Sequence, residues 1–179
     1  MRKIAERIEY SPTTIYLHFK DKQALFQELC AVDFLAFARV FERVLKVKDP
    51  VERLRKIGLT YVKFGLEHPH HHRLMFMTPH TPVDPEPGSI QKGNPDQDAY
   101  ALLRLTVEQA LEAGALRTDL GDADALAQVL WSGVHGVVAL QIAKGNDAWI
   151  DWKPVAKTAE RMVEAMIHGL AAPRAARRS

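Results

Sequence analysis

Apolar and polar residues follow the period of an α-helix along almost the whole chain, and this pattern predicts an all-α protein. Near the N-terminus, Ile4 and Ile8 lie on one face of a short helix. Ser11 suits an N-cap and Pro12 suits the first position of a second helix, which should end near His18. A short helix, a turn and a second short helix together predict a helix-turn-helix motif.

A longer helix is predicted over about residues 21–46, where it connects this motif to the rest of the chain. In the motif itself, Ile15 and Phe19 should pack against Ile4 and Ile8. The inner stripe of the long helix should consist of apolar residues at helical spacing: Leu25, Leu29, Val32, Ala36, Val40 and Val44.

The remaining pattern predicts helices at about residues 50–68, 70–77, 96–114, 122–143 and 154–170. Residues 78–95 contain five of the ten prolines and should form a loop. The second half of the helix at 122–143 is apolar nearly all round, so it needs cover on both sides, and in so small a chain one cover should be another subunit. With the helix at 154–170 it predicts a homodimer held by a four-helix bundle.

Composition narrows the function classes. The chain has 179 residues and a formal net charge of +2, so any binding to nucleic acid must be local. A single cysteine, Cys30, excludes an intrachain disulfide and fits a reducing cytoplasm. The sequence contains no signal peptide and no long uncharged apolar span, so we expect a cytoplasmic protein that does not enter a membrane.

The residues of the N-terminal motif resemble the DNA-binding domain of the tetracycline-repressor (TetR/AcrR) family. The resemblance covers residues 2–8 and 11–25, where the spacing of Ile-Ala, Ser-Pro, Tyr, His-Phe and Lys is kept. In the C-terminal half, residues 131–136 (Trp-Ser-Gly-Val-His-Gly) resemble the Trp-His-Gly group of the family. The resemblance implies a head and connecting helix at 1–46, a ligand-binding and dimerisation domain at 47–172 and a basic tail at 173–179.

The resemblance also implies a DNA-binding surface. Bases would be touched by residues 12–14 and by Arg2, phosphates would be held by Tyr16 and His18, and Lys22 would clamp the DNA backbone. The whole implied set is Arg2, Ser11, Pro12, Thr13, Thr14, Tyr16, His18 and Lys22.

Two positions depart from the family pattern. Glu9 stands where the family usually has glycine, because the turn commonly needs a positive φ. A residue with a side chain can be held in that conformation at a strain cost of roughly 1 kcal/mol. Family members also have a helix ahead of the position of Met1, where it covers the apolar face of the motif. We therefore expect the natural protein to begin upstream; the alternative is a chain that folds with this face exposed or covered differently.

A ligand pocket is implied in the middle helices. Trp131 and His135 are four residues apart and share a helix face, so they either wall a pocket or form a packed tryptophan and a satisfied core histidine. The residues expected to line an apolar cavity are Tyr61, Phe64, Met75, Phe76, Leu103, Thr106, Trp131 and His135.

A second cluster consists of His68, His70, His71 and His72. His68 and His72 are spaced to share a metal ion, but Pro69 separates them and no cysteine or carboxylate stands nearby, so a solvated helix start is favoured and no metal is assigned. No catalytic motif or cofactor-binding loop is present, which argues against an enzyme and assigns no cofactor.

The sequence therefore predicts a TetR-like homodimeric repressor that a largely apolar small molecule releases from a palindromic operator in double-stranded DNA. The dimer would form through the helices at about 122–143 and 154–170. Two alternatives stay open: a ligand-binding dimer without DNA binding, and a metal-responsive regulator that uses the cluster at 68–72.

Overall fold

The computed structural model describes residues 1–79 and 91–173, so part of the predicted loop and most of the predicted tail lie outside the described residues. The described part forms eight α-helices and one short 3-10 helix, and it contains no strand. The all-α prediction is confirmed. The helices are α1 Arg2–Arg7, α2 Pro12–His18, α3 Lys22–Val40, α4 Pro50–Glu67, α5 Pro69–Met77, α6 Ala99–Glu112, α7 Ala123–Lys144 and α8 Val155–Leu170.

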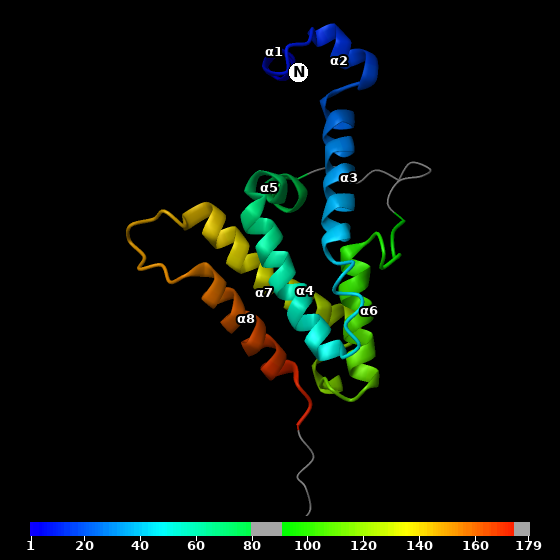
Figure 1. Cartoon of the computed structure of the whole chain (residues 1–179), viewed down its shortest axis with the longest axis vertical. Helices are drawn as coiled ribbons and strands as arrows, with labels where there is room; N and C mark the ends of the chain where they lie inside the picture. Colours follow the sequence, from blue (N-terminus) through cyan, green and yellow to red (C-terminus); the bar gives the residue numbers. More distant parts are fainter. Residues whose placement is uncertain (80–90, 174–179) are drawn as a thin grey trace, which may run out of the picture.

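Figure 1 shows α1 and α2 as a small head at one end of α3, well away from α4 and α6–α8. The far end of α3 lies against the body of the protein, where it contacts α4 and α5. A single helix therefore connects the head to the body.

Side-chain caps fix where most helices begin. Ser11 accepts a hydrogen bond from the backbone N–H of Thr14 at the start of α2, and Asp49 accepts one from Glu52 at the start of α4. Asp21, Asp98 and Asp122 cap α3, α6 and α7 in the same way. Because caps are local signals, the predicted starts of these helices lie within a few residues of the observed ones.

The prediction for the long connecting helix was wrong in two respects. Helix α3 ends at Val40, and the chain continues in tight turns that bring Phe41 and Val44 into the core. The predicted stripe also lies largely on the wrong face, because Leu29 and Val32 are exposed. The buried residues of α3 are instead Cys30, Asp33, Phe37 and Ala38.

Helix α4 is the centre of the body and packs against α6, α7 and α8. Helices α6 and α7 supply most of the largest fully buried side chains, including Leu102, Val107, Leu126 and Val138. Within the described residues, α7 alone is long and apolar enough to cross a membrane, but it packs between α4, α6 and α8 as a core helix does.

Candidate functional site

The turn of the N-terminal head is held in an unusual backbone conformation. Glu9 has a φ of 61°, as expected for a position where the family favours glycine. The N–H of Tyr10 then donates to the carbonyl of Ala5 at 2.9 Å, which closes the turn after α1. This geometry sets the angle at which α2 leaves α1.

The predicted DNA-binding residues lie on α1, on α2 and at the start of α3. Tyr16 is 52% exposed, and Pro12 and Thr14 are half-buried. The Ser11 and Thr14 hydroxyl oxygens lie 2.8 Å apart, so both take part in the cap of α2. The exposed members of the set are Arg2, Ser11, Thr13, Tyr16, His18 and Lys22.

The apolar side of the head is only partly covered within the described chain. Ala5 and Ile15 are buried between α1 and α2, whereas Ile4 and Ile8 are 38% and 51% exposed. Ile15 is therefore buried within the motif, whereas Ile4 and Ile8 keep a large part of their surface exposed. The reason is that a two-helix contact is too small to bury a complete apolar face of α1.

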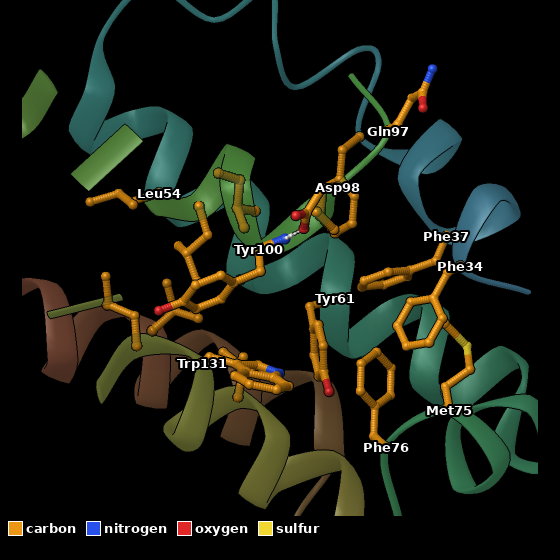
Figure 2. A pocket seen from close by; sticks show the side chains of 18 of the residues that line it. Phe34, Phe37, Leu54, Tyr61, Met75, Phe76, Gln97, Asp98, Tyr100 and Trp131 are labelled. Carbon is orange, nitrogen blue, oxygen red and sulfur yellow. Dashed lines mark hydrogen bonds between the residues drawn. The ribbon is translucent and has the colours of Figure 1, made fainter. Parts of the chain in front are cut away.

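A cavity of about 530 Å³ lies in the body, where α3 meets α4–α8. Figure 2 shows Phe34 and Phe37 from α3 and Met75 and Phe76 from α5 grouped on one side of Tyr61, with Trp131 on its other side. The described residues that line the wall are Phe34, Phe37, Phe41, Leu54, Ile57, Gly58, Tyr61, Met75, Phe76, Lys92, Gln97, Asp98, Ala99, Tyr100, Leu103, Leu130, Trp131, Val134, Val163 and Met166.

The structure brings five of the eight expected pocket residues to this wall: Tyr61, Met75, Phe76, Leu103 and Trp131. Three others lie outside it. The Phe64 ring packs 4.8 Å from that of Phe37 behind the wall, and the buried Thr106 hydroxyl donates to the carbonyl of Leu102 at 2.8 Å. His135 stands behind Tyr61 rather than at the surface of the cavity.

The Tyr61 hydroxyl joins two histidines behind the wall. It lies 2.9 Å from Nδ1 of His135 and 3.1 Å from Nε2 of His72, and the two imidazole rings stack with centroids 5.1 Å apart. A hydroxyl has one proton, so it donates to one histidine and accepts from the other. The Nδ1 atom of His72 is buried and has no hydrogen-bond partner within the described residues.

Burial keeps this group uncharged. Desolvation, with the charge on His135 as a smaller effect, lowers the pKa of His72 to about 4. Desolvation also lowers the pKa of His135 and raises the pKa of the Tyr61 hydroxyl. At neutral pH the hydrogen-bonded group of Tyr61, His72 and His135 behind the wall therefore carries no charge.

Sequence reasoning missed the contribution of α3 to the cavity. Phe34, Phe37 and Phe41 recur at helical spacing, and this signal was available to find them. Tyr100 and Met166 were also missed, and they reach the wall from α6 and α8, far apart in sequence.

The histidine cluster at the start of α5 does not converge on one point. The His72 side chain is fully buried, whereas His68 is exposed and lies against the Phe64 ring. His71 pairs with Asp33 instead. Among the described residues no group of three or more suitable ligands is placed to hold a metal ion. Nε2 of His72 lies 3.1 Å from the Tyr61 hydroxyl, so this atom already has a hydrogen-bond partner.

Comparison with known proteins decides the family. Residues 54–166 match the family described as tetracyclin repressor-like, C-terminal domain, and residues 1–29 match bacterial regulatory proteins, tetR family. The chain belongs to the TetR family of transcriptional regulators. It is therefore a DNA-binding regulator of a non-enzymatic family. No curated protein matches the chain.

Solved structures share the TetR fold with this chain. A protein with unknown function from Rhodococcus sp. RHA1 is 25% identical, with a TM-score of 0.71, and the match covers 95% of this chain and 84% of that one. A TetR family transcriptional regulator from Chloroflexus aurantiacus J-10-fl is 18% identical, with a TM-score of 0.66, and the match covers 97% and 84% of the two chains.

Proposed function

We propose that this TetR regulator is a homodimeric repressor that leaves a palindromic operator when a small molecule enters the cavity. The observation that carries the proposal is that α3 adjoins the head at its first turn and lines the cavity near its last turn. Its Phe34 and Phe37 side chains line the cavity, as does Phe41 directly after its last residue, and its first turn follows the DNA-reading helix α2. A ligand that changes the position of α3 also changes the position of the head.

The proposed dimer forms through α7 and α8. Val129 and Leu140 on α7 are 51% and 55% exposed, and Met162 on α8 is 36% exposed. Gly136 and Gly169 have open space where a Cβ atom would lie, so the backbone of a second copy can approach closely there. Apolar side chains interleaved with small residues suit the close packing of a four-helix bundle.

In the bound state, each protomer would place α2 in a major groove, and the two reading helices would lie about 34–36 Å apart on one face of the DNA. The ligand shifts this equilibrium only by binding the released conformation more tightly. The direction of the response, release rather than recruitment, rests on the family resemblance.

The test measures binding of the full chain to DNA from beside its own gene, by fluorescence anisotropy at several salt concentrations. Tyr16→Ala and Lys22→Ala should weaken binding to all sequences alike, and Lys22→Ala should lower the salt slope by about 1. Thr13→Ala and Thr14→Ala should relax the preference at individual base pairs. Lys153→Ala, in the connection between α7 and α8, serves as the charge-matched control.

Two results would contradict the proposal. One is operator affinity that none of these head substitutions changes. The other is a cavity-binding compound that leaves operator affinity unchanged. As a control on the site, Leu103→Trp fills the cavity, so this variant should keep operator binding and lose the response to the compound.

A further inference from the structure

Among the described residues of the cavity wall, the charged and amide side chains lie together at one end. Lys92, Gln97 and Asp98 come from the segment that precedes α6. The rest of the wall is aromatic or aliphatic, apart from the tips of Tyr61, Tyr100 and Trp131. The formal charges of Lys92 and Asp98 are opposite, so the described residues of the wall carry no net formal charge.

The Asp98 carboxylate is already committed to the protein backbone. Its Oδ1 atom accepts hydrogen bonds from the N–H groups of Tyr100 and Ala101 at 3.0 and 3.1 Å, and Oδ2 accepts one from Gly93 at 3.0 Å. Asp98 is thus the cap of α6, where its charge also meets the positive end of the helix. It is poorly placed to act as a counter-ion for a cationic ligand.

Both tyrosine hydroxyls of the wall are committed as well. The Tyr61 hydroxyl lies between His72 and His135, and the Tyr100 hydroxyl donates to Asp124 at 3.2 Å. Lys92 is the one cation that lines the described wall, and it is exposed to solvent at the polar end of the cavity. A charged group deeper in the cavity would therefore find no counter-ion among the described residues and no hydroxyl without a partner, and burying an unpaired charge is strongly unfavourable. Desolvation just behind the wall also lowers the pKa of His72, so a charge is unfavourable there too.

The apolar part of the wall is rich in aromatic rings. The Trp131 ring centroid lies 6.0 Å from those of both Phe76 and Tyr100, and Phe34 meets Phe76 edge to face at 5.6 Å. Figure 2 shows these rings presenting edges and faces around the cavity. A flat aromatic ligand extends such an array with the offset and edge-to-face contacts that rings prefer.

We propose that the cavity selects an uncharged, multi-ring aromatic compound and rejects charged compounds with the same ring skeleton. This inference rests on the proposed function, which makes the cavity the effector site. The cavity volume of about 530 Å³ is in the range of sites for drug-sized ligands.

The first experiment measures binding of three probes to the full chain by isothermal titration calorimetry: pyrenemethanol, pyrenecarboxylate and pyrenemethylammonium. We expect the neutral alcohol to bind at least about tenfold more tightly than either ion. Its affinity should not change with salt or in Lys92→Gln. Equal or tighter binding of an ion overturns the inference, and loss of that binding in Lys92→Gln, but not in Lys48→Gln, would identify an anion site at Lys92 instead.

The second experiment tests the preference for rings. Trp131→Leu should weaken pyrenemethanol about two- to tenfold, while leaving the saturated steroid alcohol androstanol nearly unchanged. Trp149→Leu is the matched control, because Trp149 is 97% exposed and lies outside the cavity wall. Phe34→Leu gives a second test if Trp131→Leu does not fold. Equal losses for both alcohols would contradict the aromatic preference.

Leu103→Trp separates failure of this inference from failure of the proposed function. If pyrenemethanol binds the wild type and Leu103→Trp alike, the probes do not use the cavity, and the effector site itself is wrong. If Leu103→Trp abolishes binding but all three probes bind the wild type equally, only the ligand class is wrong. If pyrenemethanol does not bind the wild type at all, the ligand class is again overturned, and operator binding still tests the regulator.

Discussion

Asp33 of α3 accepts a hydrogen bond from His71 of α5, with 2.7 Å between Asp33 Oδ1 and His71 Nδ1. Asp33 is only 8% exposed, although it is a carboxylate. Because α5 also supplies Met75 and Phe76 to the cavity wall, this bond joins the helix that carries the head to a helix that contacts the ligand space.

Removal of this bond should weaken the protein. His71→Ala leaves a nearly buried carboxylate without its imidazole partner, so the free energy of unfolding should fall by about 1–3 kcal/mol. Urea denaturation measures the change, and His70→Ala is the control, since His70 is exposed on the same helix. A double-mutant cycle with Asp33→Asn should give a coupling of about 1 kcal/mol; additive effects would show that the pair contributes nothing.

Glu9 gives a prediction about backbone strain. With its φ of 61°, a side chain is disfavoured there and glycine is tolerated. Glu9→Gly should leave the stability of the head unchanged or raise it by up to about 1 kcal/mol. Glu9→Val should destabilise the head by about 1–3 kcal/mol, because a β-branched residue resists the left-handed region. Amide hydrogen exchange of α1 and α2 measures both, and identical protection in the two variants would argue against strain at this turn.

His72 predicts how stability depends on pH. Its pKa is about 4 in the folded state and about 6.5 in the unfolded chain, so the unfolded state binds more protons between these values. Its contribution to stability is therefore complete above about pH 6.5, and it falls by roughly 1.4 kcal/mol per pH unit as the pH drops toward 4. His135, whose pKa is also lowered, adds to the slope. Urea denaturation at several pH values measures it.

His72→Gln provides the comparison for that measurement. The variant is less stable at all pH values because it alters the layer behind Tyr61, but its stability should vary less with pH from 6.5 to 4. A wild-type slope retained in His72→Gln would assign the effect to other groups.

The sequence predicted features that depend on local chemistry. The start of α2 follows from Ser11 and Pro12, and the family resemblance implied the positive φ of Glu9. What could not be predicted was which face of α3 turns inward. Leu29 and Val32 form one apolar stripe on this helix, and Phe34 and Phe37 form another. Contacts with α4 and α5 decide between these stripes, and such contacts are not encoded locally.

The cavity and His135 likewise depend on contacts between helices that the local sequence does not specify. Trp131 and His135 were expected on one face of a helix, yet only Trp131 reaches the wall. His135 instead forms a hydrogen bond with the hydroxyl of Tyr61, which lies 74 positions earlier in the chain. This outcome resembles the satisfied core histidine that the sequence left open as an alternative, and only the packing of α4 against α7 distinguishes the two.

Gly136 provides a test of the proposed dimer that does not depend on the ligand. A Cβ atom added to this residue would meet nothing within 4 Å inside the protomer, so a larger side chain fits the isolated chain without a clash. In the proposed four-helix bundle, Gly136 lies on the same exposed side of α7 as Val129 and Leu140, where a second copy would pack. Gly136→Leu should therefore leave the helical fold intact and weaken the dimer.

Sedimentation velocity over a concentration series measures the effect. We expect the dimer dissociation constant of Gly136→Leu to rise by about tenfold or more, since overpacking a close contact costs about 1–3 kcal/mol. Glu112→Leu, at the exposed end of α6, is the control for an added surface leucine. Because each protomer reads half of a palindrome, operator binding should weaken in parallel with dimerisation. A Gly136→Leu dimer as tight as the wild type would place the interface elsewhere on the surface.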